Sequence, residues 1–328
     1  VPARCAFRFR NYSPNEVSVV RESTFEGNNF GPDLSTIWAE ANLRIEDCLF
    51  ENMKITCDRQ RSVKAPLLGG AVHQAWGTLE CSGSVCSEFH AVSRGGAIYT
   101  LGNSTFENCV FMGNSCGDWG SAITCERGNL RLSDCLVAFN ESLQGKAAVD
   151  FYCSSEFELL VESCVIGENN GSSIYLTRGE IVESTVTAGN YGNAIEIGSV
   201  LSDGYLLVRD SVVTTHPGFG IALYINNPFP VYQPVVELWG ATICSNHTGQ
   251  IDPSLRWTDL GGNSVRDECE QMACPTDLNE DGTTDGGDLG LFFVFWGVCD
   301  DCPADFNDDD VVDGIDLGIL FSAWGPCT

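Results

Sequence analysis

Short apolar runs recur at a nearly constant interval through the first three quarters of the chain. Each run contains a small residue followed by a β-branched one, as in GGAV at 69–72, GGAI at 95–98 and GNAI at 192–195. The small residues are Ala71, Ala97, Ala122, Ala148, Ser173, Ala194 and Gly220, at successive intervals of 26, 25, 26, 25, 21 and 26 residues. So regular an interval predicts a repeat architecture in which each unit packs on its neighbours.

A second pattern, an apolar run that ends in Asn, alternates with the first. It occurs as TFEGN from 24, CLFEN from 48, CVFMGN from 109, CLVAFN from 135, CVIGEN from 164 and TVTAGN from 185. Asn and Gly between such runs predict tight turns between short strands, and no helical periodicity of comparable length competes. We therefore predict a mainly β fold in which residues 1–260 wind into a solenoid.

The pairing of GGA(I/V) with FxxN resembles the repeats of right-handed parallel β-helix proteins, notably those of the polymorphic outer-membrane family. The resemblance covers roughly residues 20–250 and implies a right-handed parallel β-helix; it says less about the role. Stacked coils about 4.8 Å apart would align like residues in ladders. One inward-facing ladder is expected from Cys48, Cys109, Cys135 and Cys164.

Two short helices are predicted near the C-terminus, where a 26-residue segment that begins at Cys274 is repeated from Cys302. Apolar residues in each copy fall at i, i+3, i+4 and i+7, which makes one stripe on a helix. The stripes are Leu289, Phe292, Phe293 and Trp296, and Leu317, Leu320, Phe321 and Trp324. They argue against the alternative of an acidic disordered tail.

Each predicted helix follows an acidic loop with the ligand spacing of a calcium site. Oxygens at loop positions 1, 3, 5, 7, 9 and 12 surround a hard cation such as Ca²⁺. The loops supply Asp277, Asn279, Asp281, Thr283, Asp285 and Asp288, and Asp305, Asn307, Asp309, Val311, Asp313 and Asp316. We therefore predict two bound Ca²⁺ ions. Because Asp replaces the Glu of an EF-hand at position 12, a Kd of about 10⁻⁴ to 10⁻³ M is expected.

The duplicated loop-helix unit resembles a type I dockerin over residues 274–327. Pro275 and Pro303, just before the loops, fit the absence of an entering helix in that family. The resemblance implies a small α-helical calcium module that attaches the chain to a protein partner. Positions 10 and 11, which read the cohesin in cellulosomal dockerins, are here Gly286, Gly287, Gly314 and Ile315. The expected partner is therefore another kind of protein or another copy of the chain.

The chain is acidic throughout, which excludes two classes of partner. Its net charge is −28 over 328 residues, and residues 274–328 contain 13 Asp or Glu and no Lys or Arg. Such a surface disfavours nucleic acid and anionic membranes, and no run of 18 apolar residues predicts a membrane span. We expect a β-helix at 1–260, a connection or cap at 261–273 and the calcium module at 274–328, with Val1 opening a mature or trimmed form.

Seventeen cysteines and weak calcium loops indicate an extracellular location, secreted or at the cell surface. Cys81 with Cys86, and Cys116 with Cys125, are close enough in sequence for local disulfides. In the tail the favoured disulfide joins Cys274 and Cys327. The alternative arrangement joins Cys274 with Cys299 and Cys302 with Cys327.

Candidate catalytic carboxylates are spread along the β-helix. Glycosidases gather their carboxylates around one bond, whereas here they occur about once per coil, which favours a solvated face. They are Asp118, Glu126, Asp134, Asp150, Glu162, Glu183 and Glu196. No catalytic residue is assigned. A sugar-binding track of Trp38, Trp76, Trp119 and Tyr99 is considered, with packing in the core or a cap as the favoured interpretation.

Two functions are compatible with these patterns. The favoured one is a structural or cell-surface interaction protein, a β-helix rod with a calcium-dependent docking module that assembles tail to head into extracellular filaments, with a cell-surface glycan as a further partner. The alternative is a polysaccharide-active enzyme, a lyase or hydrolase, displayed through the dockerin. A groove with three convergent carboxylates, or with an Arg–carboxylate pair, would favour the enzyme.

Overall fold

The chain forms two compact units in the computed structural model, Val1–Glu268 and Cys269–Thr328. The structure describes residues 5–10, 15–26, 35–51, 70–91, 93–154, 156–198, 204–224, 234–269, 276–278, 283–298, 302–307 and 311–326. None of the helices in these ranges is long and apolar enough to cross a membrane.

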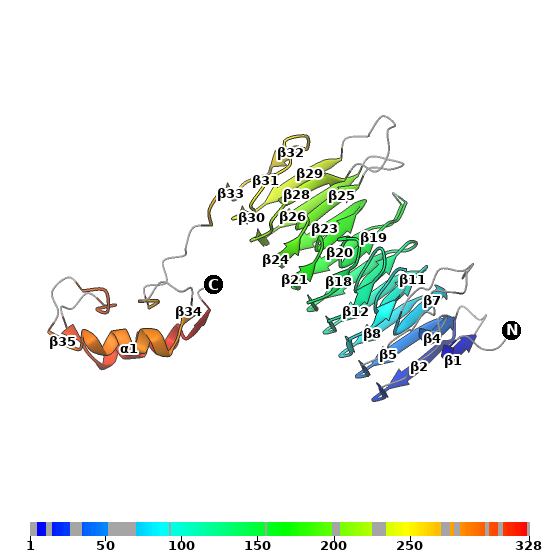
Figure 1. Ribbon diagram of the computed structural model, residues 1–328, viewed down its shortest axis with the longest axis horizontal. Coiled ribbons are helices and arrows are strands. Elements are labelled where there is room, and N and C mark those ends of the chain that lie inside the picture. The colour runs from blue at the N-terminus through cyan, green and yellow to red at the C-terminus, as the bar shows by residue number, and fades with distance from the viewer. Residues whose placement is uncertain are drawn as a thin grey trace. The chain divides into compact units, whose positions relative to one another are not determined.

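The first unit is a parallel β-solenoid of the right-handed type, in which three sheets run the length of the stack (Figure 1). Sheet A contains β1 (Cys5–Arg10), β4 (Ser35–Glu40), β7 (Val72–Trp76), β11 (Ile98–Thr100), β15 (Ile123–Cys125), β19 (Val149–Phe151), β22 (Ile174–Leu176), β25 (Ile195–Gly198), β28 (Phe219–Tyr224) and β31 (Gly249–Ile251). Sheet B contains β2 (Val17–Arg21), β5 (Asn42–Glu46), β8 (Leu79–Ser82), β12 (Ser104–Glu107), β16 (Leu130–Ser133), β20 (Leu159–Glu162), β23 (Arg178–Val182), β26 (Tyr205–Arg209), β29 (Val235–Trp239) and β32 (Arg256–Asp259). Sheet C contains β3 (Thr24–Glu26), β6 (Leu49–Glu51), β9 (Val85–Ser87), β13 (Val110–Met112), β17 (Leu136–Ala138), β21 (Val165–Asn170), β24 (Thr185–Tyr191), β27 (Val212–Thr214), β30 (Thr242–Cys244) and β33 (Ser264–Arg266), with β10 (His90–Ala91), β14 (Ser115–Cys116) and β18 (Glu141–Ser142) beside them. The predicted parallel β-helix is confirmed.

The interval between GGA(I/V) motifs is the length of one coil. In sheet A, Ile98 pairs with Ile123, and Ile123 with Val149, so the motifs lie in register on neighbouring strands. All three side chains are fully buried in the core or nearly so. Like residues therefore stack, because each parallel strand repeats the inward and outward alternation of the strand below it.

A residue with positive φ forms the corner between sheets B and C in most coils. Non-glycine residues at this corner include Asp47, Asn108, Asp134, Ser163, Glu183 and Asp210, with φ between 48° and 52°. A cysteine follows this corner in four coils and points inward. Cys48, Cys109, Cys135 and Cys164 are buried free thiols, so the predicted ladder is confirmed.

The local disulfides expected from sequence are wrong. Cys81, Cys86, Cys116 and Cys125 are all buried free thiols. Proximity in sequence misled here because Cys81 belongs to β8 in sheet B and Cys86 to β9 in sheet C, on either side of a corner.

Asparagine side chains link coils in sheet C. The backbone N–H of Asn114 donates to Asn140 Oδ1 at 3.0 Å, and that of Asn140 donates to Asn169 Oδ1 at 3.0 Å. All three residues are fully buried. These bonds satisfy backbone groups that the turn leaves without a strand partner, which is the role that the recurring Asn predicted.

The second unit contains α1 (Gly286–Val294) and α2 (Gly314–Ser322). Two antiparallel strand pairs join its halves reciprocally. β34 (Thr283–Thr284) pairs with β37 (Gly325–Pro326), and β35 (Gly297–Val298) pairs with β36 (Val311–Val312). Each loop therefore pairs with the segment that follows the other half's helix, as expected of a pseudo-twofold repeat.

The small core of this unit uses only part of the predicted apolar stripes. Phe292 and Leu320 are fully buried with Ala304 and Val312, and Leu289 and Leu317 pack against them. The aromatic ends of both stripes remain exposed: Phe293, Trp296, Phe321 and Trp324 are each about half accessible, from 47% to 53%. A nine-residue helix can bury only about one residue per turn against so small a partner.

Candidate functional site

The outward face of sheet A carries a continuous row of polar and aromatic side chains. Each three-residue strand buries its first and third residues in the core, so the middle residue points outward. Strand register places these residues one above another in the order Trp38, His73, Tyr99, Thr124, Asp150, Tyr175 and Glu196. The rings stack at the start of the row, with Trp38 and His73 centroids 4.1 Å apart.

Arg94 and two carboxylates gather at the middle of this row. The Arg94 guanidinium forms an ion pair with Glu126, and its Nε lies 3.8 Å from Asp118 Oδ2. Tyr99 donates its hydroxyl hydrogen to Glu126 Oε2 at 2.7 Å. Burial acts to lower the pKa of Arg94, but the neighbouring carboxylates of Glu126, Asp150 and Asp118 raise it above its usual value. Glu126 is thus oriented by two donors.

Asp150 is the buried acid of the cluster. It lies on β19 between Thr124 and Tyr175, is 1% exposed, and its Oδ1 has no hydrogen-bond partner within the described ranges. Burial raises the pKa of Asp150 to about 8, and the charges of Glu126, Asp118 and Glu196 act in the same direction, against Arg94. The carboxyl group is therefore mostly protonated at pH 7 and can donate a proton.

Aromatic rings and a lysine adjoin the acid. The ring centroids of Trp119, Tyr175 and Tyr224 lie 5.4 to 5.5 Å apart in edge-to-face pairs. Lys146 Nζ lies 4.6 Å from the centroid of Trp119 and 3.2 Å from the hydroxyl of Tyr224. Burial raises the pKa of Tyr175 well above its usual value, so its hydroxyl stays neutral.

The prediction that the carboxylates form a solvated face is wrong for three of the seven residues. Asp118, Glu126 and Asp150 converge around Arg94, because stacking brings together residues that are far apart in sequence. Glu196 lies further along the row, where Ser172 and Asn193 donate to its Oε1 at 2.6 and 3.0 Å.

The remaining predicted carboxylates lie elsewhere. Asp134 and Glu183 are corner residues with positive φ, and Glu162 on sheet B pairs with Arg131. Of the proposed aromatic track, Trp38 and Tyr99 belong to the sheet A row, Trp119 adjoins the acid, and Trp76 ends β7 with 38% exposure. Tyr99 and its neighbours are packed on one another, as the packing interpretation expected.

Sequence reasoning missed Arg94, Lys146 and Tyr175. A signal for Tyr175 was present, since the residue after the Ile or Val of each GGA(I/V)-like motif forms the sheet A row. Lys146 takes the place of the first glycine in the GGA(I/V)-like motif and Arg94 directly precedes that motif, so the sequence shows their positions in the repeat but not their contacts with other coils.

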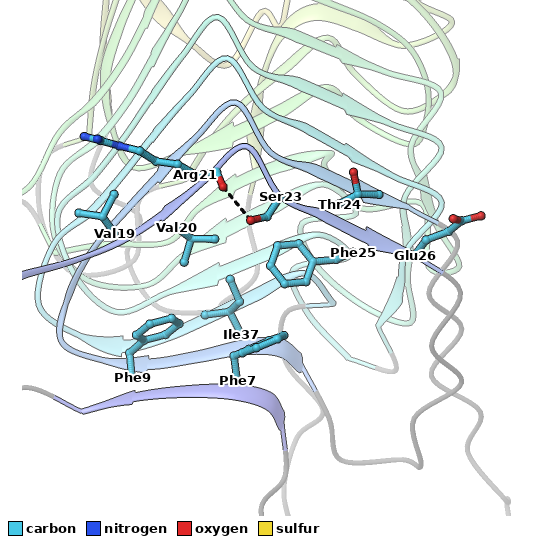
Figure 2. A pocket seen from close by; sticks show the side chains of 10 residues that line it. All are labelled: Phe7, Phe9, Val19, Val20, Arg21, Ser23, Thr24, Phe25, Glu26 and Ile37. Atoms are coloured by element: carbon cyan, nitrogen blue, oxygen red, sulfur yellow. Dashed lines mark hydrogen bonds between the residues drawn. The ribbon is translucent and has the colours of Figure 1, made fainter.

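A separate cavity of about 720 Å³ opens at the N-terminal end of the solenoid (Figure 2). Its walls are mainly apolar side chains, Phe7, Phe9 and Phe25 from the first coil and Ile37 from the second, which point toward one another. The polar part is a rim of Arg21, Ser23, Thr24 and Glu26. Among the described residues, the cavity is thus lined by the first coils of the core and lacks the gathered acids of sheet A.

The structure describes nine of the twelve residues that the sequence predicts as calcium ligands. The Asp288 side chain is fully buried and accepts backbone N–H bonds from Leu278 and Asp285, both at 2.7 Å. Asp316 is equally buried and accepts from Phe306 and Asp313, both at 2.9 Å. Asp285 and Asp313 cap the two helices. Asp277, Thr283, Asp305, Asn307 and Val311 are described, whereas Asn279, Asp281 and Asp309 lie outside the described residues.

Residues 269–328 contain no Lys, Arg or His, so no basic side chain of this unit offsets the charge of the two buried carboxylates. Asp288 and Asp316 each accept backbone N–H bonds from two described residues, and carboxylate oxygens are the type of ligand that Ca²⁺ takes. The donor set therefore fits Ca²⁺. Within the described ranges alone, no three acidic, His or Cys side chains form a metal-sized group.

Disulfides involve Cys244, Cys269 and Cys302. The alternative tail pattern uses Cys302, whereas the favoured pattern leaves it out. Cys274, Cys299 and Cys327 lie outside the described residues, so the tail pairing itself stays a prediction.

Comparisons with known proteins give only matches of low similarity. No family model and no curated protein matches the chain. Three solved structures of the periplasmic alginate epimerase AlgG are similar. One point mutant has a TM-score of 0.38, the protein with no mutation named has 0.32, and a second point mutant has 0.31. Each is 12% identical, and the match covers 79% of both chains.

The prediction of a structural rod that polymerises into filaments is corrected by the geometry of sheet A. An Arg–carboxylate pair and convergent acids lie where a solvated face was expected, and this arrangement favours the polysaccharide-active alternative.

Proposed function

We propose that the β-helix is a polysaccharide-active enzyme whose acid–base site lies on sheet A. One observation carries this proposal: Asp150, a buried acid with a pKa of about 8, adjoins Glu126, a carboxylate oriented by Arg94 and Tyr99. Two carboxyl groups whose environments separate their protonation states are the usual basis of acid–base assignments.

The proposed reaction is hydrolysis of a glycosidic bond. Asp150 is 1% exposed, so it passes its proton through one bridging water to the leaving glycosidic oxygen, while Glu126 takes a proton from the water that attacks the anomeric carbon. Arg94 holds Glu126 in place and offsets negative charge. Arg94 and Glu126 side chains are 33% and 26% exposed, so substrate approaches from their side of the row.

A ligand can reach the side chains that lie beside the sheet A row. The row itself is almost fully buried from His73 to Glu196, with exposed fractions of 0% to 8%, whereas Arg94, Asp118, Trp119, Glu126 and Lys146 are half-buried. Aromatic rings such as Trp119 supply flat apolar surface for sugar rings beside the polar groups that orient them.

Site variants assayed against a panel of plant, algal and bacterial polysaccharides test the proposal. Asp150→Asn and Glu126→Gln are each expected to lower kcat at least about 100-fold, since general acid–base groups typically contribute about 10²- to 10⁴-fold. Glu162→Gln, in an exposed ion pair on sheet B, is the matched control. The proposal would be contradicted if all three variants still released product. It would also be contradicted if the folded chain released product from none of the polymers.

For the second unit we propose a calcium-folded docking module of the dockerin type, in an extracellular or periplasmic protein. The buried Asp288 and Asp316, the reciprocal strand pairs and the two capped helices support it. Exposed Phe293 with Trp296, and Phe321 with Trp324, offer two aromatic pairs to a partner. Because residues 274–328 have no basic side chain, the partner is a protein with a basic surface.

A further inference from the structure

Lys146 has a different environment from most arginines in the described part of the β-helix. It is the only lysine in the described ranges, lies half-buried before β19, and forms no ion pair with a described carboxylate. Seven arginines of the same unit are paired with Asp or Glu: Arg8, Arg10, Arg21, Arg44, Arg94, Arg131 and Arg178. Unlike these seven arginines, Lys146 has no carboxylate partner among the described residues, so its charge is open to an anion from outside the chain.

Aromatic rings hold this cation in place without neutralising it. Lys146 Nζ lies 4.6 Å from the ring centroid of Trp119 and 5.1 Å from that of Tyr224. One of its three donors reaches the Tyr224 hydroxyl, at 3.2 Å. Cation–π contacts stabilise the positive charge but satisfy no hydrogen bond, so two N–H groups remain for a ligand.

The cation lies next to the proposed acid. Lys146 precedes Asp150 by four residues in the same coil, and Trp119 contacts Tyr175, whose strand neighbour is Asp150. Trp119 also directly follows Asp118, which faces Arg94. A sugar ring against Trp119 and Tyr224 would therefore lie beside the residue in contact with Asp150.

We propose that Lys146 binds one anionic group, a carboxylate or a sulfate ester, on the sugar that occupies this aromatic subsite. The inference rests on the proposed function and specifies that one sugar of the substrate is negatively charged. Trp119 and Tyr224 provide the apolar wall and the Lys146 ammonium the directional contact, which discriminates a charged sugar from a neutral one.

The direct test is lysine NMR of the full chain labelled with ¹³C-lysine, in which the Lys146 signal is assigned from its loss in Lys146→Gln. Sodium glucuronate, glucose 6-sulfate and glucose are titrated at constant ionic strength. We expect a saturable shift of the Lys146 signal with one or both anionic sugars and none with glucose. The two anionic arms separate carboxylate from sulfate. Equal shifts with glucose, or no saturation with either anion, would overturn the proposal.

Variant kinetics on whichever polymer is cleaved give the second test. Lys146→Gln should raise KM at least about 10-fold on a substrate with anionic sugars, since a charge-assisted hydrogen bond contributes more than about 1.4 kcal/mol, a factor of ten. Lys146→Arg should restore most of it, and Arg131→Gln should have no effect. If Asp150→Asn abolishes cleavage while Lys146→Gln leaves KM unchanged, the proposed enzyme function is supported and the proposed anionic subsite is contradicted.

Discussion

At the scale of single residues, two buried titratable side chains have environments that penalise their charged forms. Asp150 is held neutral on the sheet A face, and His216 is buried beside the asparagine ladder with neither ring nitrogen hydrogen-bonded within the described ranges. Both cause pH dependence, in opposite directions. Their effects can be measured separately, because Asp150 belongs to the proposed site and His216 does not.

Activity should fall as pH rises through about 8. The Asp150 carboxyl must be protonated to act as an acid, and its pKa is about 8 because it is buried near other carboxylates. A plot of kcat against pH for the polymer cleaved should therefore decline above about pH 8. A profile that stays flat to about pH 10 would contradict the assignment of Asp150 as acid.

Stability should fall as pH drops from about 6.5 to about 4, because of His216. Burial lowers the pKa of His216 to about 4. The unfolded chain, with an ordinary pKa near 6.5, then binds more protons than the folded chain, so acid favours unfolding. The loss at pH 5 is about 2 kcal/mol. Chemical denaturation across this pH range measures it.

The substitution His216→Asn should remove this loss. Asn at the equivalent ladder positions, such as Asn140, donates to a carbonyl of the preceding coil and accepts from a backbone N–H. His216 makes neither side-chain bond, although its own backbone N–H donates to Asn246 Oδ1 at 3.1 Å. We expect a higher Tm at pH 5 and little change in activity. A lower Tm would show that the packing of the imidazole ring stabilises the fold more than the hydrogen bonds of an asparagine would.

At the scale of elements, glycine has two different roles in the chain. In the GGA(I/V) turn, a Cβ on Gly96 would lie 1.8 Å from the Ser121 carbonyl oxygen of the next coil, so the backbone approach itself requires glycine. In the middle of α1, a Cβ on Gly290 would meet nothing within 4 Å. The repeated motif therefore reflects coil stacking, whereas the helix glycine has no packing reason among the described residues of its own unit.

Alanine substitutions should separate these roles. Gly96→Ala is expected to destabilise the β-helix by about 2 kcal/mol or more, as overpacking does. Gly290→Ala should stabilise the second unit by about 0.5 to 1 kcal/mol, because alanine loses less entropy in a helix. Unfolding of each variant, followed by hydrogen exchange resolved by unit, provides the comparison. Equal effects at both positions would contradict the stacking explanation.

At the scale of the whole molecule, the two units depend on different stabilising interactions. The β-helix has a continuous apolar core with ladders of Cys and Asn. Among its described residues, the small unit has four fully buried apolar side chains and two fully buried carboxylates. A core of that size gives little stability by itself, so a bound cation is expected to decide whether the unit folds.

Calcium removal should therefore unfold one unit and leave the other. With EDTA the second unit is expected to lose its helical signal and its hydrogen-exchange protection, while the β-helix keeps its β signal. Asp288→Asn should weaken Ca²⁺ binding at least about 10-fold, as loss of a charged ligand does, and Glu162→Gln should leave it unchanged. A second unit that stays protected in EDTA would contradict the calcium module. Calorimetric titration measures the affinity.

The sequence by itself determined the features that depend on periodicity. The intervals between Ala71, Ala97 and Ala122 fixed the coil length, and the duplicated loops located the two helices. Such patterns are legible because each coil or half repeats the same local packing problem, so the same residue types recur.

Only the tertiary structure decided where chemistry gathers. Arg94, Glu126 and Asp150 lie in different coils, and two of them flank strands in turns of irregular length, so no spacing in the sequence predicts their contact. The protonation of Asp150 likewise depends on burial by residues from other coils. Stacking brings these side chains together because parallel coils place residues about 25 apart in sequence within about 5 Å in space.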